Sequence, residues 1–363
     1  MHKKKAIWVS ALTVTGVAIA TAGVGMAWAD TSKPGHASAK AGCELTVLSD
    51  DLGSAQGVSA SGEYVAGSTY AYDPGNDGAG DSKPVVWRDG KPTEFMSKVQ
   101  NVIPKAKSAV AGSVNSSGTA VGTTDPEDGS GYGSFRYQDG KAVALKAPKG
   151  YEQSSATFID DDGTAAGTVT RSSDNVAVAA TWAPDSDTAT LVGGPDDIAV
   201  TSLGDDGTVY GYTDPYNSPK MWAISKDGKS QQIEIKDANS IVQDYVSFPV
   251  VNGDWMLADE FRWNRADGSE PTVHEITAKN DDGSVTGKAS AIDGKGRVYG
   301  VDADGKPEMG ADGEVTPLPV GDGDFKMVNP EDASSDGHVV VGNALRGDDE
   351  SAVTVAYMWT CEV

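Results

Sequence analysis

The chain has 363 residues, of which 53 are acidic and 29 are basic, so its formal net charge is −24. A surface this acidic repels phosphate groups, which argues against nucleic acid and anionic membranes as partners. No segment has a convincing helical period of apolar residues. Short apolar runs between glycine-containing turns predict an all-β protein instead.

Residues 1–29 have the features of a secretory signal. Three lysines at positions 3–5 precede an uncharged stretch, residues 6–28, and the sequence Ala27-Trp28-Ala29 marks a cleavage site. We therefore predict a secreted, extracellular protein. Cleavage removes three lysines and no acid, which takes the net charge to −27. The uncharged stretch is also long enough to span a bilayer, so an uncleaved N-terminal anchor is the alternative. No other membrane contact is expected.

The rest of the chain divides into a short leader and one domain. Residues 30–42 are rich in Ser, Ala, Lys, Gly and Pro, a composition typical of a flexible lead-in. Residues 43–363 are predicted to form a single domain, because two sequence markers recur along their whole length.

The first marker is a hairpin motif. A short polar pair precedes a glycine, which takes a positive φ without a Cβ clash, and an apolar strand follows. The turn glycines are Gly62, Gly118, Gly163, Gly207, Gly253, Gly296 and Gly337. Most copies have a second glycine in the strand, which lets a neighbouring backbone come close. The copy around Gly253 is degraded.

The second marker is a large side chain that ends a later apolar run in each repeat. These residues are Trp87, Tyr137, Trp182, Trp222, Trp263, Met309 and Trp359, and they recur every 40–50 residues. This period is typical of a β-propeller, in which each sheet packs on the next. The two markers together predict seven four-stranded antiparallel blades.

The sixth repeat has two candidate turns. Asn280-Asp-Asp-Gly283 fits the hairpin pattern as well as Gly296 does, but it lies only 13 residues earlier. That interval is too short for a blade. We interpret the earlier turn as a decorated loop or as an alternative register of the sixth blade.

The two cysteines suggest how the ring closes. Cys43 begins an apolar strand with no hairpin partner before it, and the last repeat, ending at Cys361, lacks a fourth strand. If the first strand completes the last blade, no sheet edge is left open and the two cysteines lie on neighbouring strands. The chain-entropy model gives about 5 kcal/mol for closing a loop of this length. The alternative is a pair of free thiols.

Two of the third-strand segments, with the turns that follow them, resemble a known family of repeat proteins. The segments Val85-Val-Trp87-Arg-Asp-Gly-Lys91 and Ser134-Phe-Arg-Tyr137-Gln-Asp-Gly-Lys141 are the closest copies of a pattern that resembles the extracellular HAF-repeat proteins, which are similar to Kelch and WD40 propellers. The resemblance covers about residues 43–363 and departs from the pattern at the fifth turn and at Met309. It implies a propeller and an extracellular location, and it implies no catalytic residues.

Ligand binding is expected on the face that carries the loops between second and third strands, because these loops vary in length and chemistry. Three of them combine Tyr with Asp or Asn. Aromatic rings stack on the C–H faces of sugars, and exposed Tyr also serves protein recognition. The candidate ligand-binding residues are Tyr70, Tyr72, Asp73, Asn76, Asp77, Asp125, Asp128, Tyr132, Asp214, Tyr216 and Asn217. The alternative is that these residues are simply loop formers.

Calcium is the one cofactor that the sequence suggests. Asp73, Asp77 and Asp81 offer oxygen ligands in a glycine-rich loop. The spacing is not that of an EF-hand, because Pro84 stands at the twelfth position. The alternative is a solvated acidic loop.

Catalytic motifs are absent from the sequence. It has no Gly-x-Ser-x-Gly elbow and no His/Cys cluster with zinc spacing. We predict a non-enzymatic, lectin-like module for extracellular or cell-wall carbohydrate, acting alone or in a secreted multi-protein assembly. A protein–protein interaction scaffold is the first alternative. A glycoside-active enzyme using loop carboxylates is the second.

Overall fold

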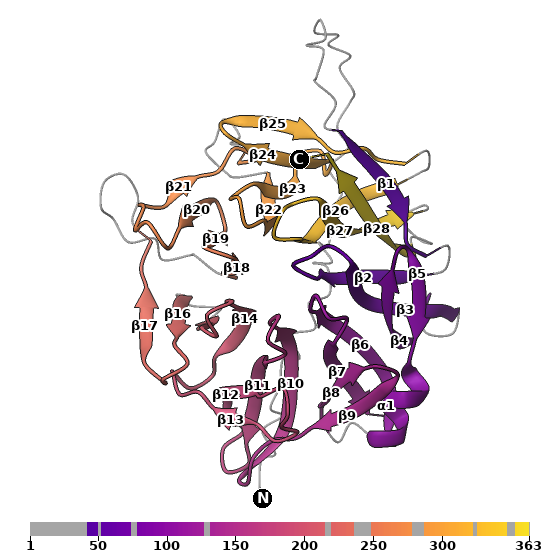
Figure 1. The fold of residues 1–363 in the computed structure, drawn as a ribbon, viewed down its shortest axis with the longest axis vertical. Coiled ribbons are helices and arrows are strands. Elements are labelled where there is room, and N and C mark those ends of the chain that lie inside the picture. The colour runs from indigo at the N-terminus through magenta and orange to yellow at the C-terminus, as the bar shows by residue number, and fades with distance from the viewer. Residues whose placement is uncertain are drawn as a thin grey trace, which may run out of the picture. The chain divides into compact units, whose positions relative to one another are not determined.

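The computed structural model describes residues 42–49, 52–73, 78–126, 131–214, 219–235, 248–277, 287–321, 325–346 and 353–362. Within them, 28 strands form seven four-stranded antiparallel sheets, which confirms the predicted seven-bladed β-propeller. All of these strands belong to one compact unit, Ser38–Val363. Figure 1 looks down the ring, with the first strand of each blade nearest the centre.

Each of the first three blades contains four consecutive strands. Blade 1 contains β2 (Gly53–Val58), β3 (Tyr64–Asp73), β4 (Gly78–Arg88) and β5 (Lys91–Glu94). Blade 2 contains β6 (Ala106–Val114), β7 (Ala120–Pro126), β8 (Gly133–Gln138) and β9 (Lys141–Leu145). Blade 3 contains β10 (Tyr151–Ile159), β11 (Ala165–Arg171), β12 (Ala177–Trp182) and β13 (Thr190–Leu191).

The next three blades repeat this plan with shorter strands. Blade 4 contains β14 (Ala199–Leu203), β15 (Val209–Thr213), β16 (Lys220–Ile224) and β17 (Ser230–Ile233). Blade 5 contains β18 (Val250–Asn252), β19 (Trp255–Ala258), β20 (Phe261–Asn264) and β21 (Thr272–Val273). Blade 6 contains β22 (Lys288–Ile292), β23 (Val298–Val301), β24 (Pro307–Ala311) and β25 (Glu314–Pro317).

Blade 7 is built from both ends of the domain. It contains β26 (Phe325–Ala333), β27 (Val339–Arg346), β28 (Val353–Cys361) and, as its outer strand, β1 (Cys43–Val47). Cys43 lies opposite Cys361 in the register and the two form a disulfide bond. The predicted closure is therefore confirmed.

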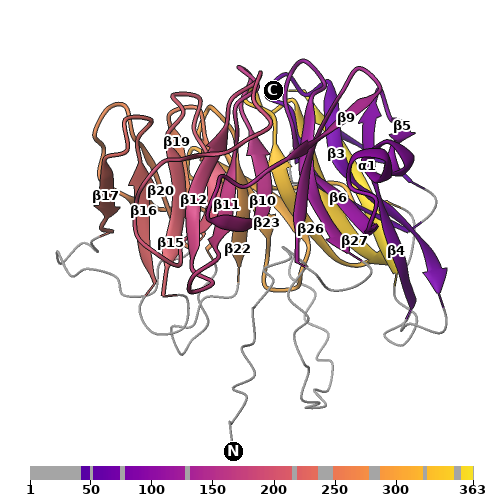
Figure 2. The ribbon, with the colours of Figure 1, turned by 90° about the horizontal axis from the view of Figure 1, so that it is seen from below.

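The connections lie on two faces, seen at the upper and lower ends of the upright strands in Figure 2. The turn face carries the hairpins between first and second strands and between third and fourth strands. The loop face carries the connections between second and third strands and from blade to blade. In blade 6 the first hairpin turns at Gly296, which decides between the two predicted registers, since β22 begins after the earlier candidate.

The second glycine of the motif has the predicted packing role. A Cβ at Gly122 or Gly167 would lie 1.9 or 1.8 Å from a carbonyl oxygen of the blade's first strand. In both blades that strand has a β-bulge beside the glycine. Blade 5 has Ala258 at this position, and the pairing of β18 with β19 is regular. The glycine is therefore needed where a bulged carbonyl crowds the second strand.

Three of the recurring tryptophans tie their blade to the one before it, whereas Trp222 donates to the Thr213 hydroxyl of its own blade at 3.2 Å. Trp87, Trp182 and Trp359 are fully buried on the third strands of their blades. Their indole Nε1–H groups donate to the carbonyl oxygens of Leu48, Lys146 and Pro319 at 2.9, 3.0 and 2.8 Å. Each acceptor follows the outer strand of the preceding blade, so one side chain supplies both apolar burial and a specific hydrogen bond.

One helix departs from the sequence expectation. α1 (Met96–Val102) lies between blades 1 and 2, where seven residues are too few to show a helical period. It forms because Met96 and Val99 are buried and the preceding Phe95 stacks on Tyr137 with ring centroids 3.9 Å apart. In the described part of the chain, no helix has the length and apolarity that a membrane span requires.

Candidate functional site

The predicted ligand-binding residues that the structure describes lie at the loop-face ends of their strands. Asp125 lies near the end of β7 and Tyr132 immediately precedes the neighbouring strand β8; burial, with a smaller contribution from the Asp125 charge, raises the pKa of the Tyr132 hydroxyl. Tyr70 lies against blade 7, where burial raises its pKa and a hydrogen bond with Thr354 partly opposes this. Asp214 is exposed on blade 4.

Several predicted residues cannot be placed in this way. Asn76, Asp77, Asp128, Tyr216 and Asn217 lie outside the described residues. Tyr72 and Asp73 belong to β3, but their side chains also lie outside the description.

Of the three predicted calcium ligands, Asp81 is the one whose side chain is among the described residues. Asp81 is exposed and forms a salt bridge with Lys107 at 3.3 Å. Among the described residues, no group of three or more His, Cys, Asp or Glu side chains is arranged to hold a metal ion.

The structure adds an aromatic residue that the sequence reasoning missed. Phe248 lies on the loop face just before β18, with 52% of its surface exposed and a φ of 61°. Its ring contacts Tyr212 edge-on, with centroids 4.9 Å apart. A left-handed backbone at a bulky residue costs about 1–3 kcal/mol and is typical of functional positions. The signal available in the sequence was a Phe before Pro249, a position that disfavours helical backbone.

Asp214, two residues after Tyr212, is also exposed and left-handed, with a φ of 56°. The exposed ring of Phe248 thus contacts the buried Tyr212, and the exposed Asp214 follows Tyr212 by two residues at the end of β15. We call Phe248, Tyr212 and Asp214 the aromatic patch.

The innermost strand of blade 7 places two acids at the closing seam, the contact between blades 7 and 1. The Asp332 carboxylate accepts a hydrogen bond from the backbone N–H of Val58 in blade 1 at 2.9 Å. Glu331 accepts hydrogen bonds from the amides of Asn329 and Asn343 at 3.0 and 3.3 Å. Burial raises the pKa of Asp332 to about 7 and also raises the pKa of Glu331. The seam therefore contains an acid that changes charge near neutral pH.

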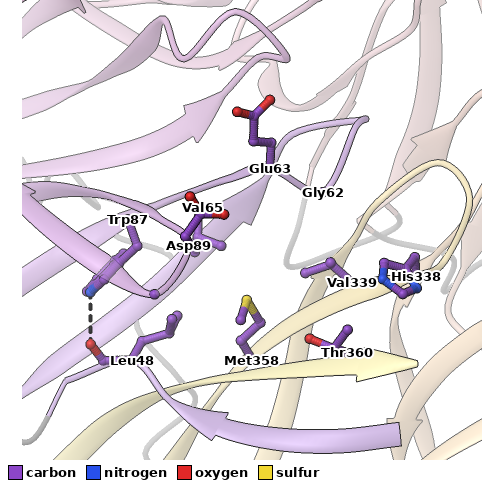
Figure 3. Close-up of a pocket in the computed structure, with 11 residues that line it drawn as sticks. Leu48, Gly62, Glu63, Val65, Trp87, Asp89, His338, Val339, Met358 and Thr360 are labelled. Carbon is purple, nitrogen blue, oxygen red and sulfur yellow. Dashed lines mark hydrogen bonds between the residues drawn. The ribbon is translucent and has the colours of Figure 1, made fainter. Parts of the chain in front are cut away.

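A cavity of about 210 Å³ opens at the same seam on the turn face. Figure 3 shows its walls, which come from β3 and β4 of blade 1 on one side and from β27 and β28 of blade 7 on the other. Leu48, Val65, Trp87, Val339 and Met358 give it an apolar lining. The sequence reasoning assigned this face to scaffold, and no residue type in the turns pointed to the cavity.

The two histidines in the described part of the chain are both engaged in structural contacts. His274 is buried, and its ring nitrogens contact the Asp259 carbonyl oxygen at 3.0 Å and the Thr277 hydroxyl at 3.3 Å. His338 Nδ1 donates to the Cys361 carbonyl oxygen at 2.6 Å. The Thr277 hydroxyl beside His274 is the one pairing of a hydroxyl with a histidine among these contacts, and burial lowers the pKa of the His274 ring.

Comparisons with known proteins show similarity in fold and no relationship in sequence. No family model and no curated protein matches the chain. The chain is similar in structure to an oligogalacturonate lyase in complex with manganese, with a TM-score of 0.54, 11% identity, and coverage of 90% of this chain and 95% of that one.

Two further structures give the same result. YCF48 bound to D1 peptide matches with a TM-score of 0.50 and 10% identity over 89% of this chain and 97% of that chain. A prolyl endopeptidase matches with a TM-score of 0.53 and 10% identity over 86% of this chain, which spans only 50% of the endopeptidase. At these identities the comparisons show the propeller alone, which hosts both enzymes and binding proteins.

Proposed function

We propose that this protein is an exported, non-enzymatic binding module that recognises carbohydrate through its loop face, in the manner of a lectin. The exposed ring of Phe248 carries the proposal. Exposing a large apolar side chain to water costs free energy, and a left-handed backbone at that residue costs more. Contact of the ring with a ligand explains why Phe248 has this conformation.

The chemistry of the aromatic patch suits a sugar. A flat ring stacks on the apolar C–H face of a pyranose, while an exposed carboxylate such as Asp214 accepts hydrogen bonds from its hydroxyls. The pair of Tyr132 and Asp125 offers the same combination on blade 2. Ligand sites of this type combine an apolar contact with a few placed polar groups.

Export is supported by two independent features. Residues 1–29 resemble a secretory signal, and the Cys43–Cys361 disulfide requires an oxidising compartment. Membership of the HAF-repeat group, on the motif around Trp87 and Tyr137, is part of the same proposal.

The non-enzymatic part is supported by the contacts of the described histidines. His338 holds a backbone carbonyl oxygen, and His274, which lies beside the Thr277 hydroxyl, is buried below the surface. A glycoside-active enzyme is the competing interpretation, and turnover of a polysaccharide by the purified chain would establish it.

A glycan array tests the proposal. The mature chain, beginning at Asp30, is applied to extracellular and cell-wall glycans beside Phe248→Ala, Tyr132→Ala and the control Leu191→Ala. Leu191 is 41% exposed on the outer strand β13, so its variant removes a comparable apolar surface away from the loop face.

We expect binding by the parent and the control, and weaker binding by the two loop-face variants. Equal binding by all four proteins would refute the assignment to the loop face. An array without signal, together with a stably co-purifying protein, would favour the interaction scaffold instead.

A further inference from the structure

The cavity at the closing seam lies beside Val339, the first residue of β27. In blades 1, 5 and 7 the first residue of the second strand packs on the turn glycine of the next blade. Tyr64 fills this place between blades 1 and 2, where a Cβ at Gly118 would lie 2.8 Å from its ring. Trp255 does the same between blades 5 and 6, with its ring 2.5 Å from a Cβ at Gly296.

At the closing seam the equivalent residue is Val339, which packs on Gly62. Valine is much smaller than tyrosine or tryptophan, so space remains beside it. Met358 lines that space from β28. Its counterpart in blade 2 is Arg136, which also stands one residue before the large third-strand side chain. Arg136 crosses to blade 3 and donates to the carbonyl oxygens of Trp182, Ala183 and Pro184 at 3.2, 2.9 and 2.6 Å.

The mouth of the cavity carries hydrogen-bond acceptors on opposite sides. Asp89, exposed on the β4–β5 turn, has no ion-pair partner within the described residues. Its neighbour Glu63 is neutralised by a salt bridge with Arg88. On the blade 7 side, His338 donates through Nδ1 to a carbonyl oxygen, which makes Nε2 an acceptor in the neutral ring. The mouth therefore favours a cation with N–H donors.

The size of the cavity decides what can enter. Pockets that enclose a whole small molecule have volumes of about 300–1,000 Å³, and this one has about 210 Å³. It matches a single anchoring side chain of the kind that concentrates binding energy at protein interfaces. We infer that the closing seam docks a partner protein through a large apolar side chain flanked by a lysine or arginine, the apolar group entering the cavity and the cation contacting Asp89.

A short peptide probe tests this docking site without knowledge of the partner. The full mature chain, labelled with ¹⁵N in tryptophan, is titrated with the blocked hexapeptide Gly-Ser-Lys-Phe-Ser-Gly. The readout is the indole N–H resonance of Trp87, assigned by its absence in Trp87→Phe. Trp87 lines the cavity and bonds Leu48, so an occupant alters its environment.

We expect saturable binding by the Lys-Phe peptide. Replacing Phe by Ala in the peptide should weaken binding about tenfold or more, because the buried ring supplies most of the energy. Replacing Lys by Glu should weaken it about fivefold, and Asp89→Asn in the protein about threefold, as for exposed ion pairs.

Two variants of the protein make the assignment specific. Asp139→Asn alters the same Asp-Gly turn in blade 2, where Asp139 is also left-handed and exposed, and should leave the affinity unchanged. Thr360→Trp fills the cavity from β28 and should abolish the shift of the Trp87 resonance. An unmoved Trp87 resonance, equal affinity for the Lys and Glu peptides, or equal effects of Asp89→Asn and Asp139→Asn would each overturn the inference.

Discussion

The aromatic patch and the closing-seam cavity are two binding surfaces of opposite shape on the same propeller. In the patch, the side chain of Phe248 protrudes from the loop face, with 52% of its surface exposed. On the turn face, the cavity lies between walls from two blades and can accept an apolar group. A protruding ring suits the flat face of a sugar, and a hollow suits a side chain. The two surfaces therefore point to two different ligands.

They also differ in how the fold supports them. The closing seam has a small residue, Val339, where the seams after blades 1 and 5 have Tyr64 and Trp255, and the disulfide between Cys43 and Cys361 lies within blade 7, on one side of this seam. The disulfide holds β1 on β28 inside blade 7, so this blade stays complete although a cavity lies beside Val339. The aromatic patch needs no such joint, because Phe248 lies on a blade connection rather than in the core.

The largest expected effect comes from removing the disulfide. The double variant Cys43→Ala, Cys361→Ala releases a loop with a sequence separation of 318 residues. The free energy of unfolding should fall by about 5 kcal/mol in the chain-entropy model. Urea denaturation of the parent and the double variant measures this difference in the free energy of unfolding. The variant molecules that remain folded should keep the aromatic patch. A change below about 1 kcal/mol would show that strand pairing and packing alone hold blade 7 together.

The second effect contrasts the closing seam with a filled one. Arg136→Met leaves carbonyl oxygens of blade 3 without their donor and should cost about 3 kcal/mol. The matched variant Met358→Ala, at the equivalent position beside the cavity, should cost less than half as much, because the methionine is only partly buried there. Equal costs from thermal or urea unfolding would mean that the two seams are packed alike.

The closing seam should make the stability depend on pH through Asp332. Burial raises the pKa of Asp332 from its ordinary 3.8 to about 7, so the folded protein binds this proton more tightly than the unfolded chain. Stability from this group is complete below about pH 4 and is lost as the pH rises through 7. Allowing for partial contact with water, the loss should be about 2 kcal/mol.

The variant Asp332→Asn removes the titrating group and should flatten the pH dependence of the unfolding free energy between pH 4 and 7. Asp125→Asn, which replaces an exposed carboxyl group on the loop face, is the control. A flat profile in the parent protein, or an unchanged profile in Asp332→Asn, would contradict the assignment.

The smallest expected effect is a change in stability at the aromatic patch. Phe248→Gly relieves the left-handed backbone and should raise the free energy of unfolding by about 0.5–1 kcal/mol, after allowing for the extra entropy of glycine in the unfolded chain. Leu191→Gly, in the strand β13, should change stability in the opposite direction by a similar amount. Loss of stability in Phe248→Gly would mean that the ring is held for packing rather than for binding.

The sequence predicted the fold well because the propeller is repetitive. The turn glycine and the large third-strand side chain recur with a similar spacing along the domain, and the pairing of Cys43 with Cys361 follows once the blades are counted. The helix α1 was missed because seven residues that pack on Phe95 and Tyr137 show no period of their own.

The functional surfaces were harder to predict, for physical reasons. The exposure and backbone of Phe248 are properties of a single connection and leave no repeated pattern. The cavity is lined by residues that lie far apart in the sequence, such as Trp87 and Met358, so it becomes visible only once the ring is closed in space. The pairing of Tyr132 with Asp125 was within reach, because both were expected at the same end of blade 2.

A two-ligand binding experiment tests the separation of these surfaces most directly. The glycan selected on the array and the Lys-Phe peptide are each titrated against the parent, Phe248→Ala and Thr360→Trp. We predict that Phe248→Ala loses about tenfold or more in affinity for the glycan and keeps the peptide, and that Thr360→Trp does the reverse. Loss of both ligands in either variant, or of neither ligand in both variants, would contradict the account.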